Sequence, residues 1–160
     1  NSKYLSLSPQ KVKEFTLLSN DDSIIFKSVL TRFLKRPGRK KSFLKENYIG
    51  TKYSLYSKHI PDKKTSAFLV PVGGGWIIYG AFKYLQDEEV YFLEKDGVAH
   101  QISSPFKDYE YEGVIKIDKN LIQRILGHDY ELLKREMKTQ KLRLQLKEDL
   151  NPILEIANSL

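Results

Sequence analysis

Lysine and arginine side chains are concentrated in one segment of this chain, residues 23 to 64. The segment holds twelve of these cations and two acids, a net charge of +10, whereas all 160 residues together have a net charge of +7. The rest of the chain therefore has a net charge of −3. Cations at this density repel one another unless a polyanion or an acidic surface lies beside them. The segment thus indicates a class of partner rather than a reaction.

The densest part of the segment is the run from Arg36 to Lys41, Arg-Pro-Gly-Arg-Lys-Lys. Lysine and arginine neutralise phosphates and release counterions, which is the main source of sequence-independent affinity for nucleic acid. Tyrosines follow among further lysines, and on a strand their rings could stack on unpaired bases. We therefore expect a non-enzymatic protein that contacts DNA or RNA. The predicted phosphate contacts are Arg32, Lys35, Arg36, Arg39, Lys40, Lys41, Lys45 and Lys52, and the predicted stacking residues are Tyr48, Tyr53 and Tyr56.

Other interpretations of the same segment stay open. Its cations could be a solvated loop, its tyrosines could belong to the core, and its basic face could dock an acidic protein or anionic lipid headgroups. In a protein-assembly module of this kind, the leucines at 142, 146 and 150 of a C-terminal helix would pair with the partner. Residues 9 to 36 also resemble two helices with a tight link, but a DNA-recognition motif needs a third helix.

Acidic residues gather between residues 87 and 112, where eight acids face Lys95 and Lys107 for a net charge of −6. Clustered carboxylates can hold a divalent metal for phosphodiester cleavage. However, such a nuclease site would need an acid followed by an acid-x-Lys pattern on the adjacent strand, and no acid-x-Lys follows Pro61-Asp62 at a predicted strand position. We expect soluble hairpin turns, or a surface that partly neutralises the basic segment, and we predict no metal site and no cofactor.

The three histidines, His59, His100 and His128, have no second ligand at i+2 or i+4, so their spacing does not predict zinc. His59 is the best candidate for a general acid or base, since Lys58 and its lysine neighbours could hold a phosphate beside it. A metal-independent nuclease or toxin that uses His59 or His100 is therefore a rival function. A structural or surface role is the simpler interpretation, and no catalytic residue is assigned.

The absence of cysteine excludes disulfides, thiolate nucleophiles and Cys-ligated zinc, and it fits a reducing compartment. The first eight residues contain no apolar signal-peptide core. Residues 66 to 82 are free of charge, but Pro71 and the glycines at 73 to 75 interrupt them, which favours a buried hairpin over a membrane span. We expect a protein of the cytoplasm, nucleoid or nucleus.

The N-terminal part, residues 1 to 45, is predicted to form two helices. Ser8-Pro9 is a plausible helix start, and Ile25, Phe26, Val29, Leu30, Phe33 and Leu34 recur at helical spacing before Pro37-Gly38. The middle, residues 46 to 117, should be antiparallel β, with strands near 48–56, 67–72, 76–85, 90–94, 98–103 and 113–117 and a tight turn at Lys95-Asp96-Gly97.

The C-terminal part, residues 118 to 160, is predicted to be helical. Asp118 should cap a first helix that ends at Gly127, and a longer helix should run from Tyr130 to about residue 150. The predicted fold class is α+β in one domain. It combines an N-terminal helical pair, a central antiparallel sheet of about five strands (a meander or a small curled barrel) and C-terminal helices.

Overall fold

The computed structural model describes the backbone of residues 7–19, 22–34, 38–72, 75–104 and 113–160. Within these ranges it describes the side chains except those of Ser19, Asp22 and residues 61–88. The chain divides into two compact units, of which one comprises residues 1–58 and 90–160 and the other residues 59–89.

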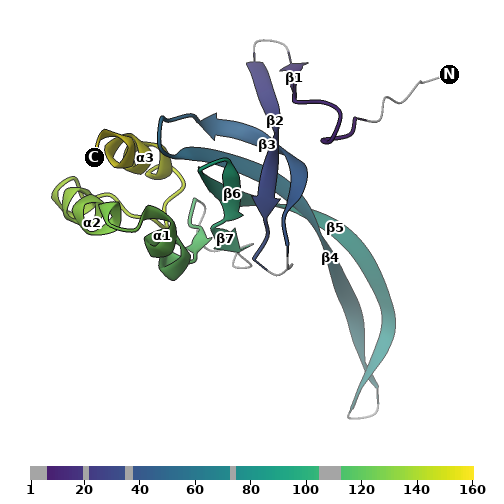
Figure 1. The fold of residues 1–160 in the computed structure, drawn as a ribbon. Helices are drawn as coiled ribbons and strands as arrows, with labels where there is room; N and C mark the ends of the chain where they lie inside the picture. Colours follow the sequence, from purple (N-terminus) through teal and green to yellow (C-terminus); the bar gives the residue numbers. More distant parts are fainter. Residues whose placement is uncertain (1–6, 20–21, 35–37, 73–74, 105–112) are drawn as a thin grey trace. The chain divides into compact units, whose positions relative to one another are not determined.

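The first unit is built on a closed five-stranded β-barrel (Figure 1). Its strands follow one another in chain order and each is antiparallel to the next, so an odd number of strands leaves the last parallel to the first. Strand β6 accordingly pairs in parallel with β2 and closes the barrel. The strands are β1 Glu14–Ser19, outside the barrel beside β2, and β2 Asp22–Arg32, β3 Lys40–Tyr48, β4 Ser54–Val72, β5 Gly75–Lys95 and β6 Val98–Gln101.

The predicted N-terminal helical pair is wrong, because Glu14–Ser19 and Asp22–Arg32 form the antiparallel strands β1 and β2. Phe15 lies opposite Phe26 in the register, and the two rings stack with centroids 5.0 Å apart. The ring of Phe43 on β3 meets Phe15 edge-on at 4.9 Å. The helix-like spacing of apolar residues therefore comes from a strand that carries them on both faces. The β-branched residues of this strand favour an extended backbone.

The middle of the chain contains strands, as the sequence predicts, and the turn between β5 and β6 is confirmed. The single strand predicted at 48–56 is wrong, because β3 ends at Tyr48 and β4 begins at Ser54, so the predicted segment includes the connection between them. Lys95 pairs with Val98, which leaves Asp96 and Gly97 as a two-residue loop. Both have positive φ, at 52° and 77°, which is the conformation of a type I′ turn. The short strands β7 Ser103–Ser104 and β8 Lys116–Ile117 form a separate pair.

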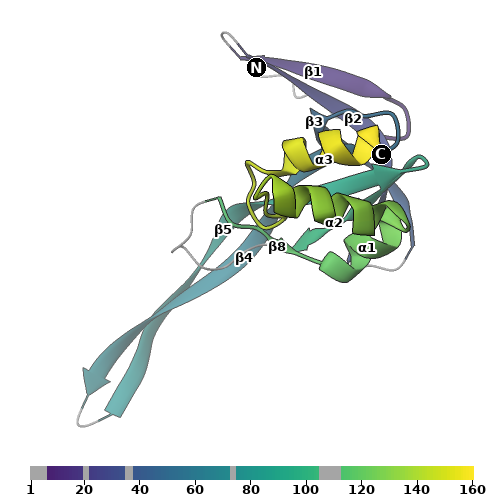
Figure 2. The ribbon, with the colours of Figure 1, turned by 90° about the vertical axis from the view of Figure 1, so that its left-hand side faces the viewer.

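Strands β4 and β5 of the first unit are buried on both faces. One face carries Tyr56 and Phe92 into the barrel, and the other carries Leu55 and Leu93 into a cluster with the C-terminal helices. These helices, α1 Lys119–Leu126, α2 Asp129–Thr139 and α3 Leu150–Ser159, lie together on one side of the barrel (Figure 2). The main core of this unit is thus the layer between barrel and helices.

The start of the helical part agrees with the sequence and its middle does not. Asp118 accepts a hydrogen bond from the backbone N–H of Leu121 at 2.9 Å, and Gly127 ends α1 with a positive φ. The predicted long helix is wrong, since α2 ends at Thr139 and α3 starts only at Leu150. Between them Leu146 forms a β-bridge with Val114, which accounts for the strand-like alternation of leucines there.

The second unit, residues 59–89, consists of β4 and β5 segments that run as neighbouring strands. The predicted strands at 67–72 and 76–85 are confirmed here, although the predicted burial of their side chains lies outside the described residues. Within the described part of the chain, no helix has both the length and the apolar character needed to cross a bilayer.

Asn158 of α3 fixes the connection between β3 and β4. Its side-chain oxygen accepts hydrogen bonds from the backbone N–H groups of Lys52 at 2.7 Å and Tyr53 at 3.0 Å, and its nitrogen donates to the carbonyl of Tyr53 at 3.0 Å. The amide also packs directly on Gly50, where an added Cβ would overlap it. One side chain therefore joins the last helix to the barrel.

We predict that Gly50→Ala and Asn158→Ala each lower the free energy of unfolding by about 1–3 kcal/mol, through overlap and through lost hydrogen bonds respectively. In the double variant the Gly50→Ala cost should shrink by about 0.5 kcal/mol or more, because the overlapping amide is gone. Urea denaturation of the four proteins measures this coupling.

The matched control is Asn151→Ala, an exposed asparagine of the same helix, which should change stability by no more than about 0.5 kcal/mol. Strictly additive losses at Gly50 and Asn158 would contradict the proposed contact.

Candidate functional site

The parallel pairing of β2 and β6 that closes the barrel sets the side chains of Arg32 and His100 beside each other. Its register pairs Thr31 with Ala99 and Arg32 with His100. Thr31 and Ala99 are fully buried, so the alternation of a strand places Arg32 and His100 on the outer face. His100 also lies opposite Leu93, whose side chain belongs to the core layer under the helices. The Arg32–His100 pair therefore faces the helical side of the barrel.

Buried polar side chains hold the ends of these strands in place. The Thr31 hydroxyl donates to the carbonyl of Lys40 at 2.7 Å and thereby fixes the start of β3. The Gln101 side chain accepts from the N–H of Leu34 at 3.3 Å and donates to the carbonyl of Ser103 at 2.8 Å. These bonds position Arg32 and the beginning of β3 relative to β6.

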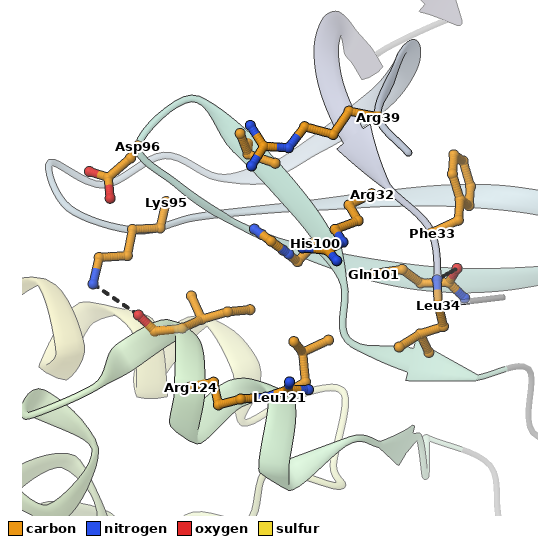
Figure 3. Close-up of a pocket in the computed structure, with 12 residues that line it drawn as sticks. Arg32, Phe33, Leu34, Arg39, Lys95, Asp96, His100, Gln101, Leu121 and Arg124 are labelled. Atoms are coloured by element: carbon orange, nitrogen blue, oxygen red, sulfur yellow. Dashed lines mark hydrogen bonds between the residues drawn. The ribbon is translucent and has the colours of Figure 1, made fainter. Parts of the chain in front are cut away.

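A pocket of about 650 Å³ opens at this place (Figure 3). Its walls come from the end of β2, the start of β3, the β5–β6 hairpin and helix α1. All of these segments belong to the first unit. We call it the cationic pocket, and its lining residues are Arg32, Phe33, Leu34, Arg39, Lys95, Asp96, Val98, His100, Gln101, Leu121, Arg124 and Ile125.

Positive charge dominates the cationic pocket. Three arginines and one lysine line it against a single carboxylate, that of Asp96. Arg32, Arg39 and Arg124 come from three separate segments, and no ion pair holds any of these guanidiniums within the described part of the chain. Guanidinium groups bind phosphate and carboxylate through paired N–H donors. The pocket therefore has the chemistry of an anion-binding site.

The environment of His100 reflects this charge. Its half-buried position lowers its pKa below the ordinary value of 6.5, and the positive charges of Arg32, Arg39 and Arg124 lower it further. Lys95 and Asp96 of the adjoining hairpin line the same pocket. Both effects, burial and the arginine charges, favour the uncharged imidazole. An anion bound among the arginines would oppose their effect and favour the imidazolium.

Lys95 and Phe33 connect the cationic pocket to its surroundings. The Lys95 ammonium donates to the carbonyl of Ile125 at 2.9 Å, at the C-terminal end of α1, where the helix dipole favours a cation. The Phe33 ring meets Phe92 edge-on at 5.4 Å, and Lys40 lies 5.2 Å from its centroid. The pocket is thus tied to the helix on one side and to the barrel interior on the other.

The structure brings part of the predicted phosphate-binding set together. Arg32 and Arg39 line the cationic pocket, and exposed Lys40 and Lys41 begin the adjoining strand β3. Lys35 and Arg36 lie outside the described residues.

Lys45 and Lys52 do not belong to this group. Lys45 is half-buried on β3 and lines a second, smaller cavity with Ser23 and Glu46. Lys52 follows the far end of β3, and the strand from Lys40 to Tyr48 spans roughly 26 Å at 3.3 Å per residue. Lys27, another cation of the segment, is paired with Glu46 at 2.6 Å. The basic segment is therefore divided between different parts of the barrel.

The predicted stacking tyrosines are core or partly buried side chains. Tyr53 and Tyr56 are only 1% and 6% exposed, and half-buried Tyr48 packs against the helical core layer. The Tyr53 hydroxyl donates to Asp129 at 2.9 Å. Tyr53 and Tyr56 therefore present no ring face to a base in this structure, because both side chains are buried.

Arg124 and Lys95 were not among the site residues predicted from the sequence, and His100 was predicted only as a catalytic residue of the rival function. All three lie outside the basic segment, and they reach Arg32 and Arg39 only through barrel closure and the packing of α1. Counting charge along the chain could not detect them. In the sequence, the site was indicated only by the excess of cations that begins at the end of β2.

The remaining predicted chemistry is dispersed. His59 and His128 are exposed and do not line the cationic pocket. In the acidic segment, Glu94 accepts from the N–H of Gly97 within its own turn, while residues 105 to 112 lie outside the described ranges. Among the residues that the structure describes, no three carboxylate or histidine side chains are grouped to hold a metal ion.

Comparisons of the chain with protein-family models, with curated proteins and with solved structures gave no match. Small closed barrels carry many unrelated functions, so the fold does not select one. The familiar five-stranded oligonucleotide-binding barrel has Greek-key connections, whereas this barrel is a meander. Function must therefore be inferred from the cationic pocket and its surroundings.

Burial of Tyr53 predicts a pH effect on stability. Burial, followed by the hydrogen bond to Asp129, raises its pKa from 10.0 to about 12. Between these values the unfolded chain has already lost the proton that the folded chain keeps, so the free energy of unfolding should fall as pH rises from 10 towards 12. Tyr53→Phe should cost about 1 kcal/mol at pH 7 and weaken this alkaline loss. Urea midpoints of both proteins across this range test it, and parallel curves would contradict it.

Proposed function

We propose that the protein binds nucleic acid through its phosphate groups, with the rim of the cationic pocket as the main contact. The observation that carries the proposal is the meeting of Arg32, Arg39 and Arg124 in one concave site. A strand that reached this site would then pass the exposed lysines at the start of β3. A ligand of this kind is consistent with a protein of the cytoplasm, nucleoid or nucleus.

The arrangement of the cations favours a role in phosphate binding over the interpretation that they form a solvated loop. Arg39, Lys40 and Lys41 are consecutive and exposed, while Arg124 adds charge from a helix more than eighty positions away. Cations that gather from distant segments raise the local potential and repel one another, which destabilises the free protein. A polyanion relieves this repulsion and releases its own counterions on binding.

The rival function, a protein-assembly module, was expected to use the apolar stripe of the C-terminal helix as its main contact surface, and this stripe is largely buried. Leu150, Ile153 and Leu154 of the predicted pairing helix are 2–5% exposed, because they pack in the core layer of the same chain. Leu142 and Leu146 are half-buried. A helix partner could not reach this stripe without unfolding the unit. An acidic protein could still compete for the basic rim, and the following experiment separates that case.

We predict that changing Arg39, Lys40 and Lys41 together to Ala weakens binding to any oligonucleotide sequence and lowers the slope of log affinity against log salt by up to about three. Fluorescence anisotropy on duplex DNA, single-stranded DNA and RNA at several salt concentrations measures the slope.

The matched control removes the same charge from helix α2, through Lys134, Arg135 and Lys138, all exposed and outside the cationic pocket. This control should keep most of the affinity. Equal losses in the two triple variants, or a wild-type affinity that hardly changes with salt, would rule out the proposed contact. A partner captured from extract that survives nuclease treatment would favour the acidic-protein alternative.

His100 supports a second candidate function, metal-independent phosphodiester cleavage. An uncharged imidazole can accept a proton, and the arginines around it could stabilise the negative charge of a reacting phosphate. A second proton-transferring group is needed to complete such a reaction, and Lys95 already donates to Ile125. Binding without cleavage therefore remains the first proposal.

Labelled RNA and DNA incubated with the protein in EDTA distinguish the two functions. Under the first proposal the strands stay intact while they bind. Cleavage that persists in EDTA and is lost in His100→Ala, but not in the exposed-histidine control His128→Ala, would establish the second function instead.

A further inference from the structure

We propose that the cationic pocket holds the phosphate monoester at the end of a nucleic-acid strand, rather than a phosphodiester within it. This inference rests on the proposed function and adds the part of the ligand that the pocket recognises. An internal phosphodiester carries one negative charge, whereas a terminal phosphate carries between one and a half and two at neutral pH, by analogy with phosphorylated side chains. The excess of cations in the pocket matches the larger charge.

The shape of the site favours an end over a passing strand. Residues from β2, the start of β3, the β5–β6 hairpin and α1 border a depression that is open to solvent, so its lining comes from several directions (Figure 3). A continuous backbone is usually tracked by an open groove with cations spaced along it. In contrast, Arg32, Arg39 and Arg124 all line one concave volume of about 650 Å³.

The lining also provides for the rest of a terminal nucleotide. Apolar side chains from the end of β2, from β6 and from α1 share the pocket with the arginines, and they are Phe33, Leu34, Val98, Leu121 and Ile125. Ligand pockets of this volume commonly combine an apolar lining with a few convergent polar groups that fix orientation. A phosphate among the guanidiniums would leave a sugar and base to contact these apolar groups.

His100 gives the site an internal reporter. It neighbours Arg32 across the closing ladder, and the positive groups that face it are Arg32, Arg39 and Arg124, with Lys95 and Asp96 on the adjacent hairpin. A phosphate bound there would raise the pKa of His100 by adding negative charge beside it. His59 and His128 do not line the pocket and serve as references in the same spectrum.

The test uses one single-stranded oligonucleotide prepared with a 5′-phosphate, with a 3′-phosphate or with neither. We expect one phosphorylated form to bind about tenfold or more tightly than the unphosphorylated form, as the loss of charge-assisted hydrogen bonds implies. Arg124→Gln should abolish this difference. The matched control Lys119→Gln removes an exposed cation from the same helix outside the pocket, and it should preserve the difference.

An NMR titration of the histidines gives the second readout. The phosphorylated oligonucleotide should raise the pKa of His100 alone. Equal affinities for all three oligonucleotides would overturn the strand-end inference and leave the proposed function intact. If no oligonucleotide binds while a nucleoside monophosphate raises the pKa of His100, the pocket serves a free nucleotide, and both the strand-end inference and the proposed function fail.

Discussion

Closure of the barrel by the parallel pairing of β2 and β6 is the constraint on which the candidate site depends. A five-stranded meander must close with parallel end strands, and the register of this closure sets Arg32 beside His100. The same closure brings the end of β2 to the β5–β6 hairpin, while Thr31 fixes the start of β3. Arg39 and Arg124 then complete the cationic pocket. If the barrel were open, these cations would belong to separate surfaces.

The helical layer has two roles in this arrangement. It covers the outer face of β4 and β5, so these strands are buried on both sides and their tyrosines become structural. It also supplies one wall of the cationic pocket through α1, which Asp118 caps at its start and Lys95 at its end. The contact of Asn158 with the β3–β4 connection joins the last helix to the barrel. Stability and binding chemistry thus use the same interface.

Sequence patterns predicted the elements whose signals are local. The type I′ turn at Asp96-Gly97, the cap at Asp118 and the stop at Gly127 depend on a few adjacent residues, and all appear as expected. The N-terminal helices failed because a strand with two apolar faces imitates helical spacing, although Ile24, Ile25 and Val29 favoured β structure. Two of the pocket's four cations, Arg32 and Arg39, were predicted from the basic segment. Arg124 and His100 were not, since pairings between distant segments leave no mark in the linear charge pattern.

NMR mapping of an oligonucleotide titration shows whether segments far apart in the sequence form one anion site. The backbone amides of residues 31–34, 98–101 and 121–125 line or flank the cationic pocket. They should shift together and with one common affinity, and raised salt should reverse the shifts. Shifts confined to the start of β3, or separate affinities for the three segments, would contradict a site assembled by barrel closure.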